Sequence, residues 1–207
     1  MKVGIMGGTF DPIHKGHLML GECAKKLFAL DEVWFMPNGN PPHKKRSSIA
    51  TDAEHRVKMV EAAISGIDGF RVERYEVDRT EVNYSYLTME HFNKIYPEHA
   101  FYFIIGADSL FSMERWVKPE RFLKTCTILA AFRDDKNLEE MEKQIQYLNE
   151  KYEADIRLMN SPKVAISSSE IRERLRKHER IDELVPEAVL LYIQENQLFK
   201  GDEDEAL

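Results

Sequence analysis

A short apolar run, residues 3–6, leads directly into Gly7 and Gly8, and the histidines His14 and His17 follow a few residues later. Glycine lets backbone N–H groups approach a ligand because no Cβ stands in the way. A helix is expected to begin at the histidines, and a helix N-terminus attracts phosphate through its unpaired N–H groups and partial positive charge. The order strand, glycine turn, helix therefore predicts a phosphate-binding unit rather than a plain turn with surface histidines.

The rest of the chain alternates strand-like and helix-like segments. Strands are expected at 2–6, 32–37, 70–77, 101–105, 127–132, 155–159 and 163–166, and helices at 16–30, 52–64, 84–95, 108–114, 119–124, 138–152, 168–177 and 186–196. Apolar strands that alternate with helices form parallel sheets covered on both faces, and right-handed crossovers make the sheet doubly wound. We predict an α/β, Rossmann-like fold with closing C-terminal helices. One domain is expected over residues 1–200, followed by an acidic, disordered tail at 201–207.

Composition and charge exclude several classes of partner. No apolar stretch approaches the roughly 20 residues that a membrane span needs, and neither a signal peptide nor a membrane partner is expected. A net charge of −7 argues against nucleic-acid binding, which requires a basic face. Cys23 and Cys126 stand far apart and are read as buried thiols of a reducing cytoplasm rather than metal ligands. The oligomeric state stays open, a homo-oligomer included.

The spacing of the glycines excludes a nicotinamide-cofactor dehydrogenase. That class carries G-x-G-x-x-G, with an acid at the end of the second strand that binds the ribose. Here the glycines are Gly4, Gly7 and Gly8, and the expected second strand ends at Pro37-Asn38, where no acid stands.

Polar residues follow several strand ends, where ligands bind in doubly wound sheets. Gly106 leaves room for a flat base or ribose, and Asp108 either accepts hydrogen bonds from a ribose or caps the next helix. The hydroxyls of residues 167–169, with Arg172 one turn further on, suit a phosphate, although an N-cap with a surface arginine is the alternative. The loop at 38–48 presents the basic run 43–46, which either contacts a triphosphate or is merely solvated.

Three segments resemble known signatures. Residues 9–17, TFDPIHKGH, resemble (T/S)-F-D-P-x-H-x-G-H, and residues 166–172, ISSSEIR, resemble I-S-S-T-x-I-R, the two signatures of the nucleotidyltransferase superfamily. Residues 106–116, GADSLFSMERW, resemble the G-A-D-x-L-x-x-L-x-x-W segment of nicotinate-nucleotide adenylyltransferases. That family makes deamido-NAD and pyrophosphate from ATP and nicotinate mononucleotide in NAD biosynthesis, and the resemblance covers nearly the whole chain.

The resemblance also implies roles for individual residues. It implies that His14 and His17 are catalytic and face the ATP phosphates, with His17 at the α-phosphate, and that Mg²⁺ is carried by ATP rather than by a protein metal site. The implied ATP-binding residues are Gly8, Thr9, Phe10, His43, Lys44, Gly106, Asp108, Ile166, Ser167, Ser168 and Arg172. The implied mononucleotide-binding residues are Tyr84, Ser85, Trp116 and Arg133.

The segment 78–88 is similar to the R-x-G-x-S-Y-T-x-x-T turn of the family, which helps to seat the nicotinate carboxylate. Two residues depart from it: Glu81 replaces the glycine and Asn83 the serine. Trp116 is expected to stack on the pyridine ring, and covering the edge of the core is the alternative.

Other activities remain open besides adenylyl transfer to nicotinate mononucleotide. The enzyme alternatives are a nicotinamide-mononucleotide adenylyltransferase and a phosphopantetheine adenylyltransferase, although the latter lacks the 106–116 segment. The alternative of another class is a non-catalytic nucleotide sensor, against which the intact His14, His17, Ser168 and Arg172 speak.

Overall fold

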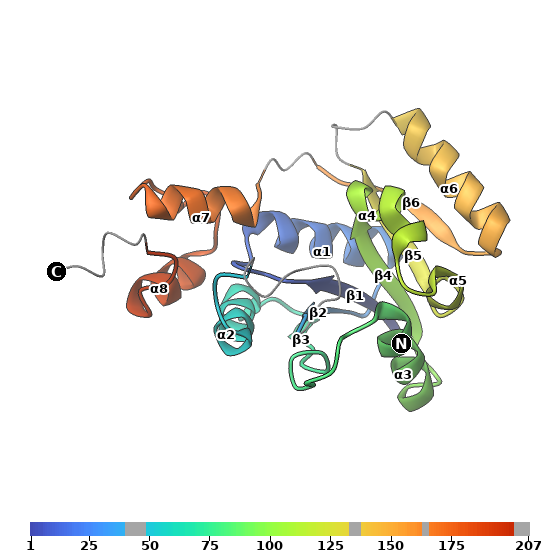
Figure 1. Cartoon of the computed structure of the whole chain (residues 1–207), viewed down its shortest axis with the longest axis horizontal. Coiled ribbons are helices and arrows are strands. Elements are labelled where there is room, and N and C mark those ends of the chain that lie inside the picture. The colour runs from blue at the N-terminus through green and yellow to red at the C-terminus, as the bar shows by residue number, and fades with distance from the viewer. Residues whose placement is uncertain (40–48, 133–137, 163–165, 201–207) are drawn as a thin grey trace.

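A parallel sheet forms the centre of the molecule in the computed structural model, which describes residues 1–39, 49–132, 138–162 and 166–200 (Figure 1). Its strands are β1 (Lys2–Gly8), β2 (Glu32–Pro37), β3 (Phe70–Val72), β4 (Ala100–Gly106), β5 (Thr127–Phe132) and β6 (Ile156–Asn160). They lie in the order β3-β2-β1-β4-β5-β6, and all of these pairings are parallel. The predicted doubly wound α/β fold is confirmed.

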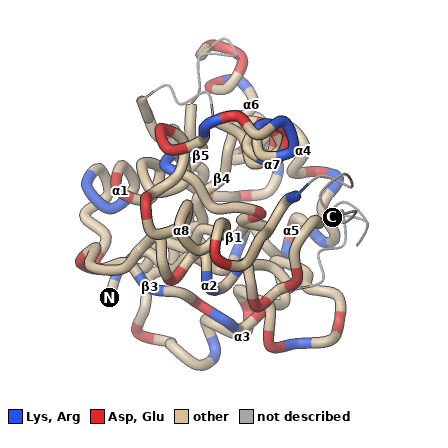
Figure 2. Tube along the Cα trace, turned by 90° about the vertical axis from the view of Figure 1, so that its left-hand side faces the viewer, with Lys and Arg blue, Asp and Glu red and all other residues tan. Residues whose placement is uncertain are grey.

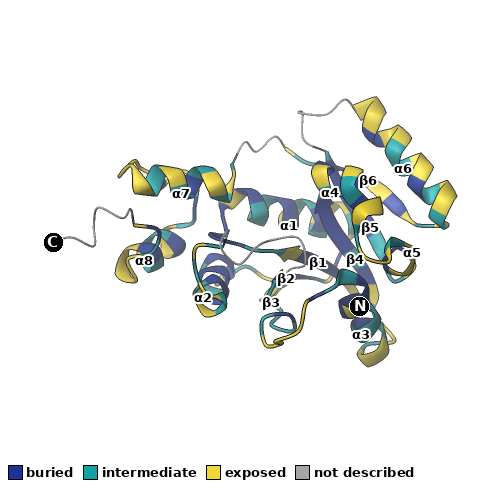
Figure 3. Ribbon diagram, in the orientation of Figure 1, coloured by how far each residue is buried: buried dark blue, intermediate teal, exposed yellow. Residues whose placement is uncertain are grey.

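Helices cover both faces of this sheet. They are α1 (Lys15–Phe28), α2 (Ala53–Ile64), α3 (Ser85–Ile95), α4 (Ala107–Ser112), the 3-10 turn η2 (Met113–Arg115), α5 (Pro119–Phe122), α6 (Leu138–Tyr152), α7 (Ser168–Arg176) and α8 (Glu187–Glu195). One hydrophobic core cluster packs α1, α2, α7 and α8 against one face of the sheet. A second cluster packs α3, α4, α5 and α6 against the opposite face. Figure 3 shows the strands buried between helices whose outer faces are exposed.

Alternation along each strand decides which core a side chain enters. In β2, Val33 and Phe35 belong to the first cluster, whereas Trp34 and Met36 belong to the second. All four are at most 1% exposed, because successive side chains of a strand point to opposite faces and both faces are covered. The continuous apolar strands read from the sequence are explained by this double burial.

The chain reverses direction across the sheet between β1 and β4. After β1 it builds β2 and β3 on one side, then returns through α3 to place β4 on the other side of β1. Ligands in such sheets bind beyond the carboxyl ends of the strands at this switch point, because the two neighbouring loops diverge there and leave a crevice.

One expected strand is wrong over most of its length. Strand β3 ends at Val72, and residues 73–78 form turns instead. Arg74 holds these turns through ion pairs to Glu54 at 3.0 Å and Asp78 at 2.9 Å. In the described sheet β3 is an edge strand that pairs with β2, up to Val72 and Phe35. Residues 163–165 of another expected strand and the 201–207 tail lie outside the described residues.

Charges are interspersed along the surface of the described chain (Figure 2). On α6 and α7 they form helical pairs, such as Lys143–Glu139 and Lys177–Glu173, both at 2.6 Å. Exposed pairs of this kind stabilise a helix by only about 0.3–0.5 kcal/mol each.

Candidate active site

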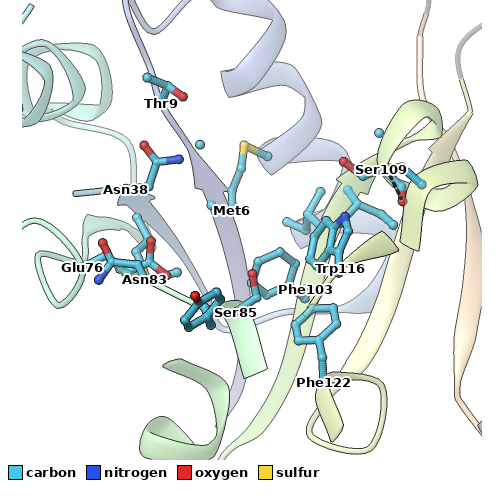
Figure 4. Close-up of a pocket in the computed structure, with 18 of the residues that line it drawn as sticks. Met6, Thr9, Asn38, Glu76, Asn83, Ser85, Phe103, Ser109, Trp116 and Phe122 are labelled. Atoms are coloured by element: carbon cyan, nitrogen blue, oxygen red, sulfur yellow. Dashed lines mark hydrogen bonds between the residues drawn. The ribbon is translucent and has the colours of Figure 1, made fainter. Parts of the chain in front are cut away.

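A cleft of about 720 Å³ opens at the switch point, beyond the carboxyl ends of β1, β2 and β4 (Figure 4). Met6, Met36 and Phe103 form its apolar floor, and α3, α4 and η2 contribute its rim. The predicted site residues that line it are Gly8, Thr9, His17, Tyr84, Ser85, Gly106 and Trp116. The structure thus brings residues of the glycine turn and of the expected mononucleotide site to one cavity.

The two histidines form a stacked pair at the start of α1. Their ring centroids are 3.7 Å apart with an angle of 24° between the planes. The backbone N–H of His14 donates to Nδ1 of His17 at 3.2 Å, so the neutral His17 ring carries its proton on Nε2. His17 lines the cleft, whereas His14 is 3% exposed and caps the helix behind it. The pair therefore presents an oriented N–H donor to the cleft.

Buried groups hold residues 9–12 in place, the turn that follows the glycines Gly7 and Gly8 at the end of β1 and is called the glycine turn below. The Arg56 guanidinium, 1% exposed, donates to the backbone oxygen of Thr9 at 2.8 Å. Burial lowers the pKa of Arg56, against which the charge of Asp11 acts to raise it. Asp11 accepts from the Thr51 hydroxyl at 2.6 Å and from the Ala50 N–H at 2.7 Å. Phe10, at the bend, has a left-handed φ of 51°, a conformation that surrounding contacts must maintain in a non-glycine residue.

The second signature docks onto the first. Ser167 caps α7 by accepting from the Glu170 N–H at 3.1 Å. The Ser168 hydroxyl donates to the Pro12 carbonyl at 2.9 Å, and the half-buried Ile166 packs against the first core cluster. Ser167, Ser168, Ile166 and Arg172 are not among the residues that line the cleft. Their expected contact with phosphate stays a prediction, beside an observed role in holding residues 11–12.

The start of α4 leaves space above β4. A Cβ on Gly106 would meet no heavy atom within 4 Å, so the backbone there borders open space that a flat base or ribose can approach. Asp108 is exposed, lies in the first turn of α4 and does not line the cleft. The N-cap of α4 is Gly106, without a side-chain hydrogen bond, so the alternative that Asp108 caps the helix is wrong. A ribose contact of Asp108 stays a prediction.

Trp116 closes the far wall of the cleft. Its ring lies 5.3 Å from that of Phe122, and Figure 4 shows both beside Phe103. The preceding Glu114 accepts from Lys151 at 2.6 Å, which anchors this turn to α6. Trp116 therefore covers the edge of the core and also lines the cleft, so the two alternatives considered for it are compatible.

The polar wall opposite Trp116 contains one residue, Glu76, that the sequence analysis missed. It consists of Asn38, Glu76 and Asn83, which line the cleft near the end of β2. Burial raises the pKa of Glu76 to about 7, although a hydrogen bond from Thr88 acts to lower it. No sequence signal singled out Glu76, because the expected strand 70–77 hid the turn that carries it. In contrast, Glu81 is exposed and lies 3.7 Å from Arg79.

Some predicted site residues cannot be placed. His43 and Lys44, with the neighbouring Lys45 and Arg46, and also Arg133 lie outside the described residues. Within the described ranges, no group of three or more His, Cys, Asp or Glu side chains is arranged to hold a metal ion. No helix of those ranges is long and apolar enough to cross a membrane.

Comparisons of this sequence with a family model and with known proteins agree on one family. Residues 5–174 match the cytidylyltransferase-like family model. The chain is 40% identical over 199 residues to a probable nicotinate-nucleotide adenylyltransferase of Clostridium botulinum (strain Alaska E43 / Type E3), covering 96% of this chain and 98% of that one. It is 44% identical over 192 residues to another of that name from Lachnoclostridium phytofermentans, covering 93% and 96%.

A solved structure agrees with the fold. The Plasmodium falciparum nicotinic acid mononucleotide adenylyltransferase complexed with NaAD superposes with a TM-score of 0.77 at 23% identity, covering 96% of this chain and 97% of that one. The same enzyme complexed with APC gives a TM-score of 0.75 at 24% identity, with 96% of each chain covered.

Proposed function

The chain belongs to the nicotinate-nucleotide adenylyltransferase family, and from this premise we infer that it transfers AMP from ATP to nicotinate mononucleotide. The products are nicotinate adenine dinucleotide, which is deamido-NAD, and pyrophosphate. The observation that carries this inference within the structure is the shared cleft: the His17 donor and the glycine turn stand on one side of it and Trp116 on the other. Two substrates can meet there.

The reaction is an in-line displacement. A phosphate oxygen of the mononucleotide attacks the α-phosphorus of ATP, the new P–O bond forms, and the bond to the bridging oxygen of pyrophosphate breaks. The attacking oxygen is already anionic, so no general base is required. The protein must hold two anions in line and stabilise the charge on the transferred group.

The residues of the glycine turn are suited to that task. We assign Nε2–H of His17 to an oxygen of the α-phosphate, because Nδ1 already accepts from the His14 N–H. The hydrogen bond from Arg56 to the Thr9 carbonyl oxygen orients the peptide groups of the turn. We assign the N–H donors of these peptide groups to the triphosphate. We further propose that Mg²⁺ enters with the triphosphate, that the pyridine ring stacks on Trp116, and that the enzyme works in the cytoplasm.

One assay tests this function against its rivals. Pyrophosphate release from Mg²⁺-ATP is measured with nicotinate mononucleotide, nicotinamide mononucleotide and phosphopantetheine offered in turn. We expect the highest kcat/KM with nicotinate mononucleotide. Release with phosphopantetheine alone, or binding of ATP without turnover of any acceptor, contradicts the proposal.

A further inference from the structure

Glu76 is a buried acid in the wall of the cleft, and few described groups stabilise the ionised form of its carboxyl group. It is 6% exposed and lines the cavity. Its Oε1 accepts a hydrogen bond from the Thr88 hydroxyl at 2.9 Å, the hydrogen bond that the described residues provide to this carboxyl group. Figure 4 shows it beside Asn83 and below Asn38, so two neutral amides are among its described neighbours.

The backbone keeps this carboxyl group in place. A Cβ on Gly39 would lie 2.2 Å from the Glu76 carbonyl oxygen and 3.1 Å from Oδ1 of Asn83, so the end of β2 packs closely on both residues. Thr88 lies on α3 and is 2% exposed. The backbone of Glu76 is therefore packed against the segment that follows β2, and its carboxyl group is directed to Thr88 of α3.

The charged residues described on the turn that carries Glu76 are paired with other groups. On its own turn, Glu73 pairs with Arg71, and Arg74 pairs with Glu54 and Asp78. Tyr75 stacks on His91 of α3 with a centroid distance of 4.3 Å. The titratable groups that line the cleft itself, from α1, the start of α3 and η2, are His17, Tyr84, Tyr86 and Arg115.

Within the part of the chain that the structure describes, no cationic side chain pairs with Glu76, and an unpaired carboxylate is unfavourable at a buried position. Burying an unpaired carboxylate costs far more free energy than one hydrogen bond from a hydroxyl contributes. The neutral form of the Glu76 carboxyl group is therefore favoured over the ionised form. This agrees with the burial that raises the pKa of Glu76 to about 7. Near neutral pH the group thus exists as both a neutral donor and an anion.

We propose that Glu76 is a proton-dependent binding group for the mononucleotide: its neutral carboxyl group donates a hydrogen bond to an anionic oxygen of that substrate, and its ionised form repels the same oxygen. The inference rests on the proposed function, since it takes an anionic mononucleotide as the occupant of this part of the cleft. An anionic oxygen is present both on the phosphate and on the pyridine carboxylate of nicotinate mononucleotide.

The test compares the wild type with Glu76→Gln across pH. Glutamine keeps a donor and an acceptor of the same shape but cannot ionise. The measured quantity is the ratio of wild-type to variant kcat/KM for nicotinate mononucleotide at saturating ATP, in which ionisations common to the two reactions cancel. With a pKa of about 7, the neutral fraction falls about tenfold between pH 6 and pH 8, and the ratio should fall by the same factor.

Two further variants separate titration from structure. Thr88→Val removes the hydrogen bond that stabilises the ionised carboxylate, so the fall should move to higher pH. Glu81→Gln alters an exposed acid outside the cleft and should show the wild-type profile. A merely structural role of Glu76 predicts a ratio that does not vary with pH, and that result overturns the proposal.

The source of the anionic oxygen is read from a second substrate. Nicotinamide mononucleotide has the phosphate but not the ring carboxylate. The same tenfold fall with both substrates assigns the contact to the phosphate, and a fall with nicotinate mononucleotide alone assigns it to the ring. A level ratio in an enzyme that turns over normally rejects the role of Glu76, whereas no turnover at any pH rejects the proposed function instead.

Discussion

The guanidinium of Arg172 donates a hydrogen bond of 2.5 Å to the backbone oxygen of Asp11, a residue 161 positions earlier in the chain. The neighbouring Ser168 hydroxyl reaches the Pro12 oxygen at 2.9 Å. The two signatures that stand at opposite ends of the sequence thus form one structural unit. The C-terminal signature holds the peptide groups just before the helix that carries the histidines.

Arg172→Ala should therefore lower both stability and activity. A hydrogen bond to a charged group contributes about 1.5–3 kcal/mol, and an Asp11 carbonyl left without this donor adds to the loss. Urea unfolding of the two proteins measures the difference in the free energy of unfolding. Arg172→Lys keeps a positive charge but lacks the planar guanidinium with its several N–H donors, so it should recover only part of the lost free energy of unfolding. Equal unfolding midpoints for wild type and Arg172→Ala contradict a structural role.

The motif residues could be predicted from the sequence because their chemistry is local. Gly7, Gly8 and the histidines follow an apolar run, and the expected strand and helix form there. The strand extends through Gly7 and Gly8, so the expected glycine turn is displaced to the residues that follow them. The stacking of His14 on His17 could not be predicted, because it depends on the geometry of the helix cap. The docking of Arg172 on Asp11 could not be read from spacing either, because the whole fold lies between them.

The cleft wall at Glu76 shows the opposite case. Alternating residues at 70–77 indicated a strand, and the pattern is compatible with one. The ion pairs of Arg74 with Glu54 and Asp78 favour a turn instead, and Glu54 comes from a separate helix, α2. Contacts with distant segments, such as Gly39 against the Glu76 carbonyl oxygen and Thr88 on the Glu76 carboxyl group, accompany this turn and are not visible in the local pattern.

His17→Ala should lower kcat about 100–1000-fold, the scale of one lost transition-state donor. The fold should stay intact, since His17 is only half-buried and its removal leaves the α1 core residues in place. Steady-state pyrophosphate release measures kcat, and circular dichroism checks the fold. Turnover near that of the wild type in a folded His17→Ala protein contradicts the assignment of Nε2–H to the α-phosphate.

Trp116→Ala should weaken the use of the mononucleotide far more than the use of ATP. An indole face attracts a pyridinium ring, and alanine leaves that surface bare. The intrinsic fluorescence should respond to the mononucleotide through Trp116, because Trp34, the other tryptophan, is 1% exposed in the core. Trp116→Phe keeps part of the stacking surface and should have an intermediate KM. Equal losses toward both substrates point to a core role alone.

Glu76→Gln should raise stability at alkaline pH. The pKa of Glu76 is raised in the folded state from 4.5 to about 7, so the unfolded chain releases this proton first. Below about pH 4.5 the group is protonated in both the folded and the unfolded state and does not reduce the free energy of unfolding. This free energy decreases as the pH rises from there to about 7. The difference is up to about 3 kcal/mol, since one pKa unit corresponds to about 1.4 kcal/mol. Thermal unfolding at pH 4.5 and pH 8 measures it, and a variant gain that is the same at both values contradicts the raised pKa.

The preference of the enzyme for nicotinate mononucleotide, a carboxylate, over nicotinamide mononucleotide, an amide, depends on N–H donors at the start of α3. Tyr84 caps this helix without a side-chain hydrogen bond, and both Tyr84 and Ser85 line the cleft. The first N–H groups of a helix have no partner within it, and they favour an anionic carboxylate over a neutral amide. Glu81, the acid that could have accepted from an amide, faces solvent beside Arg79.

Nicotinate mononucleotide should therefore be used with at least a roughly tenfold higher kcat/KM than nicotinamide mononucleotide, because one poorly paired donor costs about 1–3 kcal/mol and about 1.4 kcal/mol is tenfold. Side-by-side kinetics at pH 6 provide the cleanest comparison, since Glu76 is mostly neutral there and repels neither substrate. Glu81→Gln should leave the preference unchanged. Equal efficiency, or a preference for the amide, means that an acceptor of the cleft wall, with Glu76 and Asn83 the nearest candidates, faces the pyridine substituent in place of the helix donors.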